Sequence, residues 1–161
     1  MRRLLLATVL IAALAGCGQG ETQAPSSSST APVAAQGARS PEEIQAALAA
    51  LPGPYATANY EAGRRVFAQC RSCHTINAGG QHRVGPNLHG VFGREIGTAA
   101  GFNYSQAVQN ADFAWDAAQL DHWLANPQTF LPGNRMAFAG VRDEEQRRDV
   151  IAYLMIETAP Q

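Results

Sequence analysis

The sequence predicts an all-α fold in which short helices are joined by long loops. Apolar residues recur at helical spacing in several segments, and runs with the alternating pattern of β-strands do not occur in the chain. Between the helical segments lies a glycine-rich stretch, residues 75–104, with little periodicity. A loop of that length in a small domain is usually functional or wraps around another group.

Length and composition exclude several classes of protein. The 161 residues suffice for one domain with appendages but not for a multidomain enzyme. The net charge is −1, so the chain lacks the excess of positive charge that is typical of nucleic-acid-binding proteins. All 12 of its basic residues are arginine. Its 3 cysteines are an odd number, which argues against a small domain held together by disulfides.

Residues 1–16 are predicted to be a signal peptide. Two arginines precede an apolar run, residues 4–14, that is shorter than the roughly 20 residues a membrane-spanning helix needs. Residues 14–17, Leu-Ala-Gly-Cys, resemble the bacterial lipobox, in which the cysteine follows the cleavage site and carries lipid. We therefore expect a mature chain that starts at lipidated Cys17, since ordinary secretion would leave that cysteine as a stray thiol.

Residues 17–40 are predicted to be the lipidated N-terminus followed by a flexible tether. Their Gln, Ala, Ser, Pro and Gly residues cannot bury enough apolar surface to offset the entropy of ordering. About 22 residues of such coil span roughly 25 Å on average and about 70 Å when stretched. The sequence thus places the protein on the periplasmic side of a cell membrane, held by its lipid, without distinguishing the inner from the outer membrane.

The folded part is predicted to begin with a short helix and a connector, residues 41–58. Ser40 is a capping residue, proline occupies the first turn and Glu43 completes a capping box, whereas Pro52 ends the helix. The main domain is predicted to span residues 59–161.

Further helix starts are marked along the main domain. Asn59 caps a helix that is expected to run to about Cys70, and its Gly63, a poor helix residue, indicates close backbone contact with another element. Three later helices are predicted to open at Ser105, Asp116 and Asp143. The last of these carries an apolar stripe formed by Val150, Ile151, Leu154 and Met155.

One short motif carries the chemistry, residues 70–74 with the sequence Cys-Arg-Ser-Cys-His. Cys-x-x-Cys-His is the attachment signature of a c-type haem. One helical turn places the thiols of Cys70 and Cys73 on the same face, where they can add to the two vinyl groups of a haem. His74 then lies under the iron as an axial ligand. All the cysteines are thereby assigned, because Cys17 takes lipid.

Three other interpretations of the motif fit less well. A thioredoxin-like Cys-x-x-Cys needs a βαβ setting, which the sequence pattern lacks. A structural zinc site needs four ligands, and the sequence offers no second cysteine pair. A plain disulfide leaves His74 and the long loop unexplained.

The second axial ligand is less clearly marked. Its candidates are Met136, Met155, His82, His89 and His122. Met155 belongs to the apolar stripe of the last helix, and His122 is more typical of a surface position. Met136 follows a Pro-Gly turn that can present a thioether inward, so the residues alone favour it only slightly over the others.

From about residue 59 to residue 160 the chain resembles a class I cytochrome c of the mitochondrial and bacterial short-chain type. The stretches that match keep the family's order and separations with almost no gaps, and they are residues 70–75, 85–90, 92–94, 101–104, 126–127, 132–136, 138–140 and 151–154. The resemblance implies a class I cytochrome c fold, with helices and long loops wrapped around one covalently bound haem c. It also implies an electron carrier rather than an enzyme.

The resemblance further implies which residues hold the haem. Cys70 and Cys73 would form the thioethers, with His74 and Met136 as axial ligands. Pro86 would accept the other ring N–H of His74 through its carbonyl. Three more residues match positions that hydrogen-bond a buried haem propionate, namely Arg94, Tyr104 and Trp115.

Other implied roles concern the frame of the domain. Gly63 and Phe67 would cross the last helix, and His82 would bridge two loops. Three residues depart from the family's pattern, and the sequence therefore does not fix the reduction potential: Trp123 for a tyrosine near the methionine, Val108 for a polar internal residue, and Asn134 for a threonine of the methionine loop.

Together these features predict a monomeric, membrane-tethered periplasmic electron carrier. Its redox partners would be a cytochrome bc-type complex, a terminal oxidase, a photosynthetic reaction centre or a dehydrogenase. One alternative is a dedicated electron-acceptor subunit of a periplasmic dehydrogenase, and another is a five-coordinate, ligand-binding or peroxidatic haem protein if Met136 is not a ligand. The family usually docks through a ring of lysines, and this chain has none, so we expect weak electrostatic steering that the tether offsets by raising the local concentration.

Overall fold

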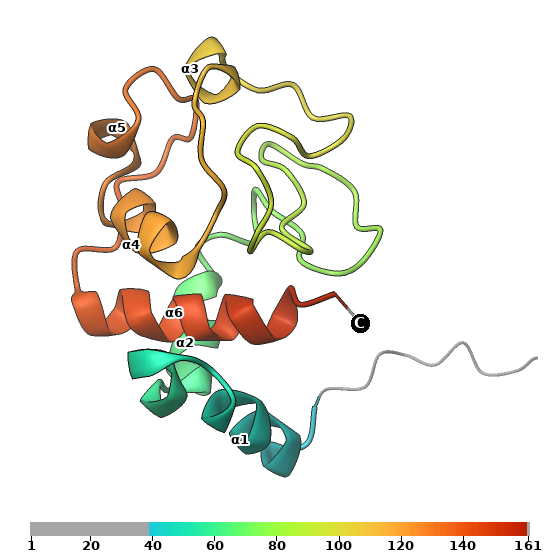
Figure 1. Ribbon diagram of the computed structural model, residues 1–161, viewed down its shortest axis with the longest axis vertical. Helices are drawn as coiled ribbons and strands as arrows, with labels where there is room; N and C mark the ends of the chain where they lie inside the picture. Colours follow the sequence, from blue (N-terminus) through green and yellow to red (C-terminus); the bar gives the residue numbers. More distant parts are fainter. Residues whose placement is uncertain (1–38, 161) are drawn as a thin grey trace, which may run out of the picture. The chain divides into compact units, whose positions relative to one another are not determined.

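The computed structural model describes residues 39–160, which form helices joined by long irregular segments (Figure 1). The elements are, in chain order, α1 (Pro41–Ala49), the 3-10 helix η1 (Gly53–Thr57), α2 (Tyr60–Phe67), α3 (Gln106–Gln109), α4 (Ala117–Ala125), α5 (Pro127–Phe130) and α6 (Glu144–Glu157). Within the described residues, extended pairing is limited to one antiparallel bridge between Glu95 and Ala114, so the predicted all-α class is confirmed.

Several sequence predictions fall on the N-terminal part of the chain. The signal peptide (1–16), the lipidated Cys17 and the tether up to residue 38 lie outside the described residues. None of the helices in residues 39–160 is both long and apolar enough to cross a membrane.

Most helices start where capping residues predicted them. The Ser40 hydroxyl accepts from the Glu43 N–H at 3.2 Å, and the Glu43 carboxylate accepts from the Ser40 N–H at 2.7 Å, which closes the predicted capping box. Four further starts are capped by the side chains of Asn59, Ser105, Asp116 and Asp143. Two details differ: α2 ends at Phe67 and continues as tight turns to Cys70, and α5, a helix of 4 residues behind Asn126, was not predicted.

Helices α2 and α6 cross at a glycine. A Cβ at Gly63 would lie 2.1 Å from the carbonyl oxygen of Asp149 and 2.9 Å from the Cβ of Tyr153, so any larger residue would force the two helices apart. One turn further along α2, Phe67 is 1% exposed, and its ring centroid lies 5.4 Å from that of Tyr153. The predicted crossing is confirmed, and it anchors the end of α2, from which the Cys-x-x-Cys-His motif continues.

Residues 41–58 pack against α6 rather than extending from the domain. Leu48 of α1 is 4% exposed. Its apolar cluster is completed by Ala58, Ala152 and Ile156. At the end of α6, Glu157 forms an ion pair with Arg39 at 3.2 Å and accepts from the hydroxyl of Tyr60 at 2.8 Å.

A partly buried ion pair joins α4 to α6 on the other side. Figure 1 shows α4 and α1 on opposite sides of α6. The Nε of Arg147 donates to the Asp121 carboxylate at 2.7 Å, and its Nη1 donates to the carbonyls of Val141 and Arg142 at 3.0 and 2.9 Å. This guanidinium therefore ties the loop before α6 to both helices.

Candidate functional site

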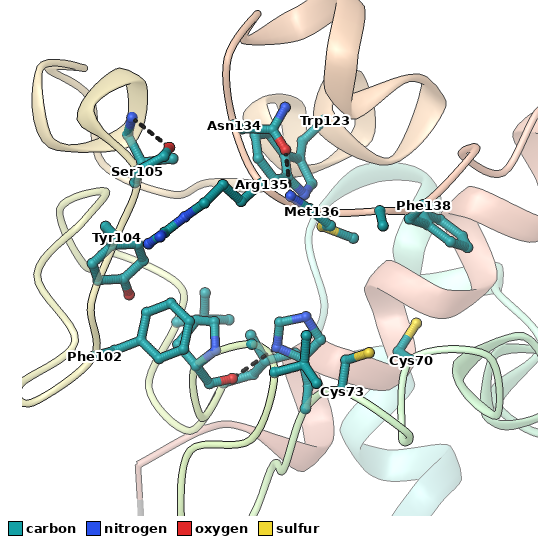
Figure 2. A pocket seen from close by; sticks show the side chains of 18 of the residues that line it. Cys70, Cys73, Phe102, Tyr104, Ser105, Trp123, Asn134, Arg135, Met136 and Phe138 are labelled. Carbon is teal, nitrogen blue, oxygen red and sulfur yellow. Dashed lines mark hydrogen bonds between the residues drawn. The ribbon is translucent and has the colours of Figure 1, made fainter.

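The glycine-rich loop and residues 134–138 border a cavity of about 600 Å³ (Figure 2). Much of its wall is apolar, formed by Leu88, Val91, Ile96, Val108, Trp115, Leu120 and Trp123. Protein interiors contain few voids larger than a water molecule, so a cavity of this size is a ligand site rather than a packing defect. Its apolar wall suits a large apolar ligand that is held at a few points by sulfur and nitrogen atoms.

Cys70, Cys73 and His74 lie together on this wall. Successive tight turns after α2 bring them there: the Cys70 N–H donates to the Phe67 carbonyl at 2.8 Å, and the N–H groups of Cys73 and His74 both donate to the Cys70 carbonyl, at 3.0 and 2.9 Å. Both cysteines are free thiols rather than a disulfide. Burial, and then the neighbouring Cys73, raises the pKa of Cys70 to about 11, so a neutral sulfur faces the cavity at ordinary pH.

The His74 ring is held by the loop that follows the motif. Its Nδ1 lies 2.7 Å from the Pro86 carbonyl oxygen, and because a carbonyl can only accept, Nδ1 carries the proton and Nε2 keeps its lone pair. Burial lowers the pKa of His74, which keeps the ring neutral. A Cβ at Gly85 would lie 2.2 Å from the Cε1 of His74, so the ring fits only against a glycine.

Met136 lies across the cavity from Cys70 and Cys73 (Figure 2). Among the five candidates for the second ligand, all in the described part of the chain, Met136 is the one that lines the cavity. Met155 is on α6 and packs against the core.

His82 is occupied in bridging two loops. Its Nδ1 accepts from the Asn87 N–H at 2.9 Å, so Nε2 carries the proton that is shared with the Ala100 carbonyl oxygen at 2.8 Å. Both ring nitrogens are therefore used inside the protein. This is the bridging role that the family resemblance implied for this residue.

Two of the three residues predicted to bind a propionate lie on the cavity wall. Tyr104 and Trp115 line the cavity, and burial raises the pKa of Tyr104, so its hydroxyl stays protonated and can donate. Arg94 is not among the lining residues. Its guanidinium donates instead to the carbonyls of Asn87 and His89, both at 3.1 Å. Arg94 thus supports the loop of residues 87–89, and its charge acts on the cavity-lining Tyr104, whose pKa it lowers against the effect of burial. Its role at a propionate stays a prediction.

The rim of the cavity is almost uncharged. Its exposed members are Gln69, Ser72, Val84, Asn103, Arg135 and Ala137. Val84 is 80% exposed, an unusual position for a large apolar residue. Arg135 extends along the cavity toward Tyr104 and donates to the carbonyl of Asn103 (Figure 2).

Sequence reasoning missed the part that three residues play in the site. Gly85 leaves room for the His74 ring, and the side-chain amides of Gln128 and Asn134 bind the backbone of Met136. The signals in the sequence were a glycine directly before Pro86 and an amide residue two positions before the methionine. The sequence does not show which residues these side chains contact, because those contacts form only in the folded chain.

Comparison with known proteins points to one family. The family model described as cytochrome c matches residues 60–156. Cytochrome c of Kluyveromyces lactis is 42% identical over 106 residues, which cover 65% of this chain and 96% of that protein. Cytochrome c of Chlamydomonas reinhardtii is 48% identical over 98 residues, covering 60% and 88%. Among solved structures, cytochrome cH from Methylobacterium extorquens superposes with a TM-score of 0.57 and 38% identity, covering 61% of this chain and 98% of that one.

Proposed function

The chain belongs to the cytochrome c family, and we propose that it is a membrane-tethered carrier of single electrons with a His/Met-ligated haem. The family holds one covalently attached haem c and carries electrons rather than catalysing a reaction. One observation carries the finer proposal: Cys70, Cys73, His74 and Met136 all line a single apolar cavity. The two cysteines would hold the haem through thioethers, and the other two residues would be its axial ligands.

The chain prepares His74 for this role before any ligand binds. The hydrogen bond from Nδ1–H to the Pro86 carbonyl fixes the tautomer and the ring orientation, as outer partners of metal-bound histidines commonly do. The lowered pKa keeps protons from competing for Nε2. Gly85 gives the ring the space to lie in this orientation.

Met136 supplies a neutral sulfur on the opposite wall. An iron held by imidazole and thioether takes up and releases one electron, and methionine ligation raises its reduction potential. If His74 and Met136 both bound the iron, no ligand position would be left for a substrate. Tyr104 and Trp115 line the same cavity and can donate to a buried anionic group of the haem.

Absorption spectroscopy of the purified holoprotein tests the ligation. The ferric protein should show the weak red-edge band of an iron–thioether bond, and the reduced protein should bind carbon monoxide poorly. Met136→Ala should abolish the band and open the iron to carbon monoxide, whereas Met155→Ala, a change on α6, should leave both properties intact. A band that survives Met136→Ala would refute the assignment of Met136. A parent protein that lacks the band and binds carbon monoxide readily would favour the five-coordinate alternative.

The proposed location depends on the N-terminal sequence. Residues 14–17 match a lipobox, and the residues up to 40 have the composition of a tether. Cys17→Ser should move the mature protein from the membrane fraction to the soluble periplasmic fraction, and mass spectrometry should show the loss of the acyl chains. Membrane association that is unchanged in Cys17→Ser would contradict the lipid anchor.

The rim around the cavity supports a partner interaction with little electrostatic guidance. Of its six exposed residues only Arg135 is charged, and redox encounters typically bury less than about 1,200 Å². A tether can instead raise the local concentration to the millimolar range. Electron-transfer rates to purified respiratory complexes and dehydrogenases, measured against ionic strength for tethered and clipped protein, test this idea. Fastest transfer to a respiratory complex would indicate a general carrier, whereas fastest transfer from a dehydrogenase would indicate its dedicated acceptor subunit. A steep salt dependence of the rate for the tethered form would argue that the tether does not replace electrostatic steering.

A further inference from the structure

We propose that Asn134 and Gln128 are positioning residues for Met136. Their side-chain amides, which we call the amide clamp, hold the Met136 peptide on both sides and so set where its thioether lies on the cavity wall. The inference rests on the proposed ligation by Met136. It concerns a part of the chain between α5 and α6 that has no helix or strand of its own to fix the backbone.

The clamp holds both polar groups of the Met136 backbone. The Met136 N–H donates to the Oδ1 of Asn134 at 2.8 Å. The Met136 carbonyl accepts from the Nε2 of Gln128 at 3.0 Å and from the N–H of Phe138 at 3.0 Å. The same Gln128 nitrogen lies 3.2 Å from the Oδ1 of Asn134, so the two amides also bind each other.

The orientation of the Asn134 amide is fixed by its surroundings. Asn134 is 7% exposed, and its Nδ2 donates to the carbonyls of Pro127 and Leu131, both at 2.8 Å. Together with the two bonds accepted by Oδ1, the side chain uses both of its donors and both acceptor sites. A reversed amide would place its oxygen against two carbonyls and its NH₂ group against the Met136 N–H, so the network permits one orientation.

The clamp also connects Met136 to the helical part of the domain. Pro127 begins α5 and Leu131 caps its C-terminal end. The Pro127 carbonyl also accepts the Leu131 N–H at 3.0 Å, and the Leu131 carbonyl accepts the Asn134 N–H at 3.2 Å, so the Asn134 amide joins a hydrogen-bonded helix end. Pro127 is fully buried, and α5 follows α4 directly at Asn126. Asn134 thus binds at once to a buried helix end and to the peptide of the proposed ligand.

Fixing the backbone matters because the methionine side chain itself is flexible. Three rotatable bonds separate its Cα from the terminal methyl group, so a loose backbone would add to the entropy lost when the sulfur is held in place. A clamp that has already ordered the peptide reduces this loss. The clamp therefore should govern how easily another ligand replaces Met136, without contacting the sulfur.

Imidazole titration of the ferric holoprotein is the test, because imidazole must displace the thioether to bind. Gln128 is the residue to change, since it is exposed and its variants should fold, whereas Asn134 is buried. Gln128→Ala removes the donor to the Met136 carbonyl, and imidazole should bind about fivefold more tightly, as expected for the loss of one hydrogen bond. Gln128→Glu, which puts a carboxylate beside that carbonyl, should produce a larger increase, about tenfold or more.

The matched control is Gln146→Glu. It makes the same chemical change at an exposed position of α6. Its imidazole affinity and its red-edge absorption band should equal those of the parent, whereas the Gln128 variants should lose the band at a lower temperature. The amide clamp is overturned if both Gln128 variants bind imidazole as the parent does while all three proteins keep the band. A parent protein without the band, unchanged by Met136→Ala, would instead overturn the proposed ligation.

Discussion

Replacing Gly85 with alanine should displace the ring of His74. The new Cβ would lie 2.2 Å from the Cε1 of His74 and 2.7 Å from each ring nitrogen. Carbon atoms in contact stay about 3.5 Å apart, so the ring would have to move by roughly 1.3 Å, the difference between 3.5 and 2.2. The ring cannot rotate freely to make room, because its Nδ1 is bound to the Pro86 carbonyl.

The cost follows from what this shift breaks. A movement of that size away from residue 85 would stretch the 2.7 Å contact between Nδ1 and the Pro86 oxygen towards 4 Å, which is no longer a hydrogen bond. Leaving that buried pair unmade costs about 1–3 kcal/mol. Overpacking at the same place costs about another 1–3 kcal/mol. We therefore expect the free energy of unfolding of Gly85→Ala to fall by about 2–6 kcal/mol.

Denaturant unfolding and ferric absorption spectra of the holoprotein measure both effects. A suitable control is Gly101→Ala, because a Cβ there meets nothing within 4 Å and the cost is limited to its positive φ of 81°. That backbone strain is about 1–2 kcal/mol and should leave the spectrum unchanged. Equal losses of stability in the two variants, with an unaltered spectrum for Gly85→Ala, would refute the reasoning.

Three further predictions concern the frame around the site. Leu48→Ala should lower the free energy of unfolding by about 2–4 kcal/mol in a denaturant titration, because it leaves a cavity between α1 and α6, and an effect below about 1 kcal/mol would show that α1 is not docked. Arg147→Ala should lower the free energy of unfolding by about 2–3 kcal/mol in the same assay, less than the loss of one partner costs in a fully buried pair, because Asp121 is 33% exposed. Adding Asp121→Asn to this variant should recover part of the loss, because it removes the unpaired charge. Burial, and then the hydrogen bond to Glu157, raises the pKa of Tyr60, so the folded state disfavours the tyrosinate. The contribution of Tyr60 to stability should therefore be complete below about pH 10 and be lost as the pH rises further. Melting temperatures measured against pH should show this decline, and Tyr60→Phe should flatten it.

The sequence predicted features whose physical cause is local. A cap needs only a side-chain oxygen and an N–H three residues later, so Ser40, Asn59 and Asp116 mark the starts of their helices by residue type and position alone. Gly63 was predictive for a related reason, since a glycine inside an otherwise good helix has few explanations besides a close crossing. Helical spacing of apolar residues likewise predicted the all-α class, and residues 70–74 predicted the haem, whereas the specific fold was implied by the family resemblance.

The features that were missed depend on contacts between distant parts of the chain. The hydrogen bonds from Arg94 to the carbonyls of Asn87 and His89 were not predicted, because nothing in the sequence indicates which carbonyls an arginine side chain will reach. Helix α5 is too short to show periodicity. Asn134 stood out only as a departure from the family's pattern, because its partners at residues 127, 131 and 136 become neighbours only after the chain has turned at α5.

The two walls of the cavity are held by separate sets of contacts, and mutations in each set are therefore expected to have different effects. On one wall, Pro86 and Gly85 fix His74. On the other, the amide clamp fixes the peptide of Met136 through α5. Neither set includes Leu48 or Arg147, whose partners lie on α4, α6 and the adjoining segments. Changes in the helical frame should therefore alter stability at constant spectrum, whereas changes in either wall should alter the ligand field even in a protein that remains well folded. Iron coordination that followed global stability alone, whichever residue was changed, would show instead that the walls have no positioning role of their own.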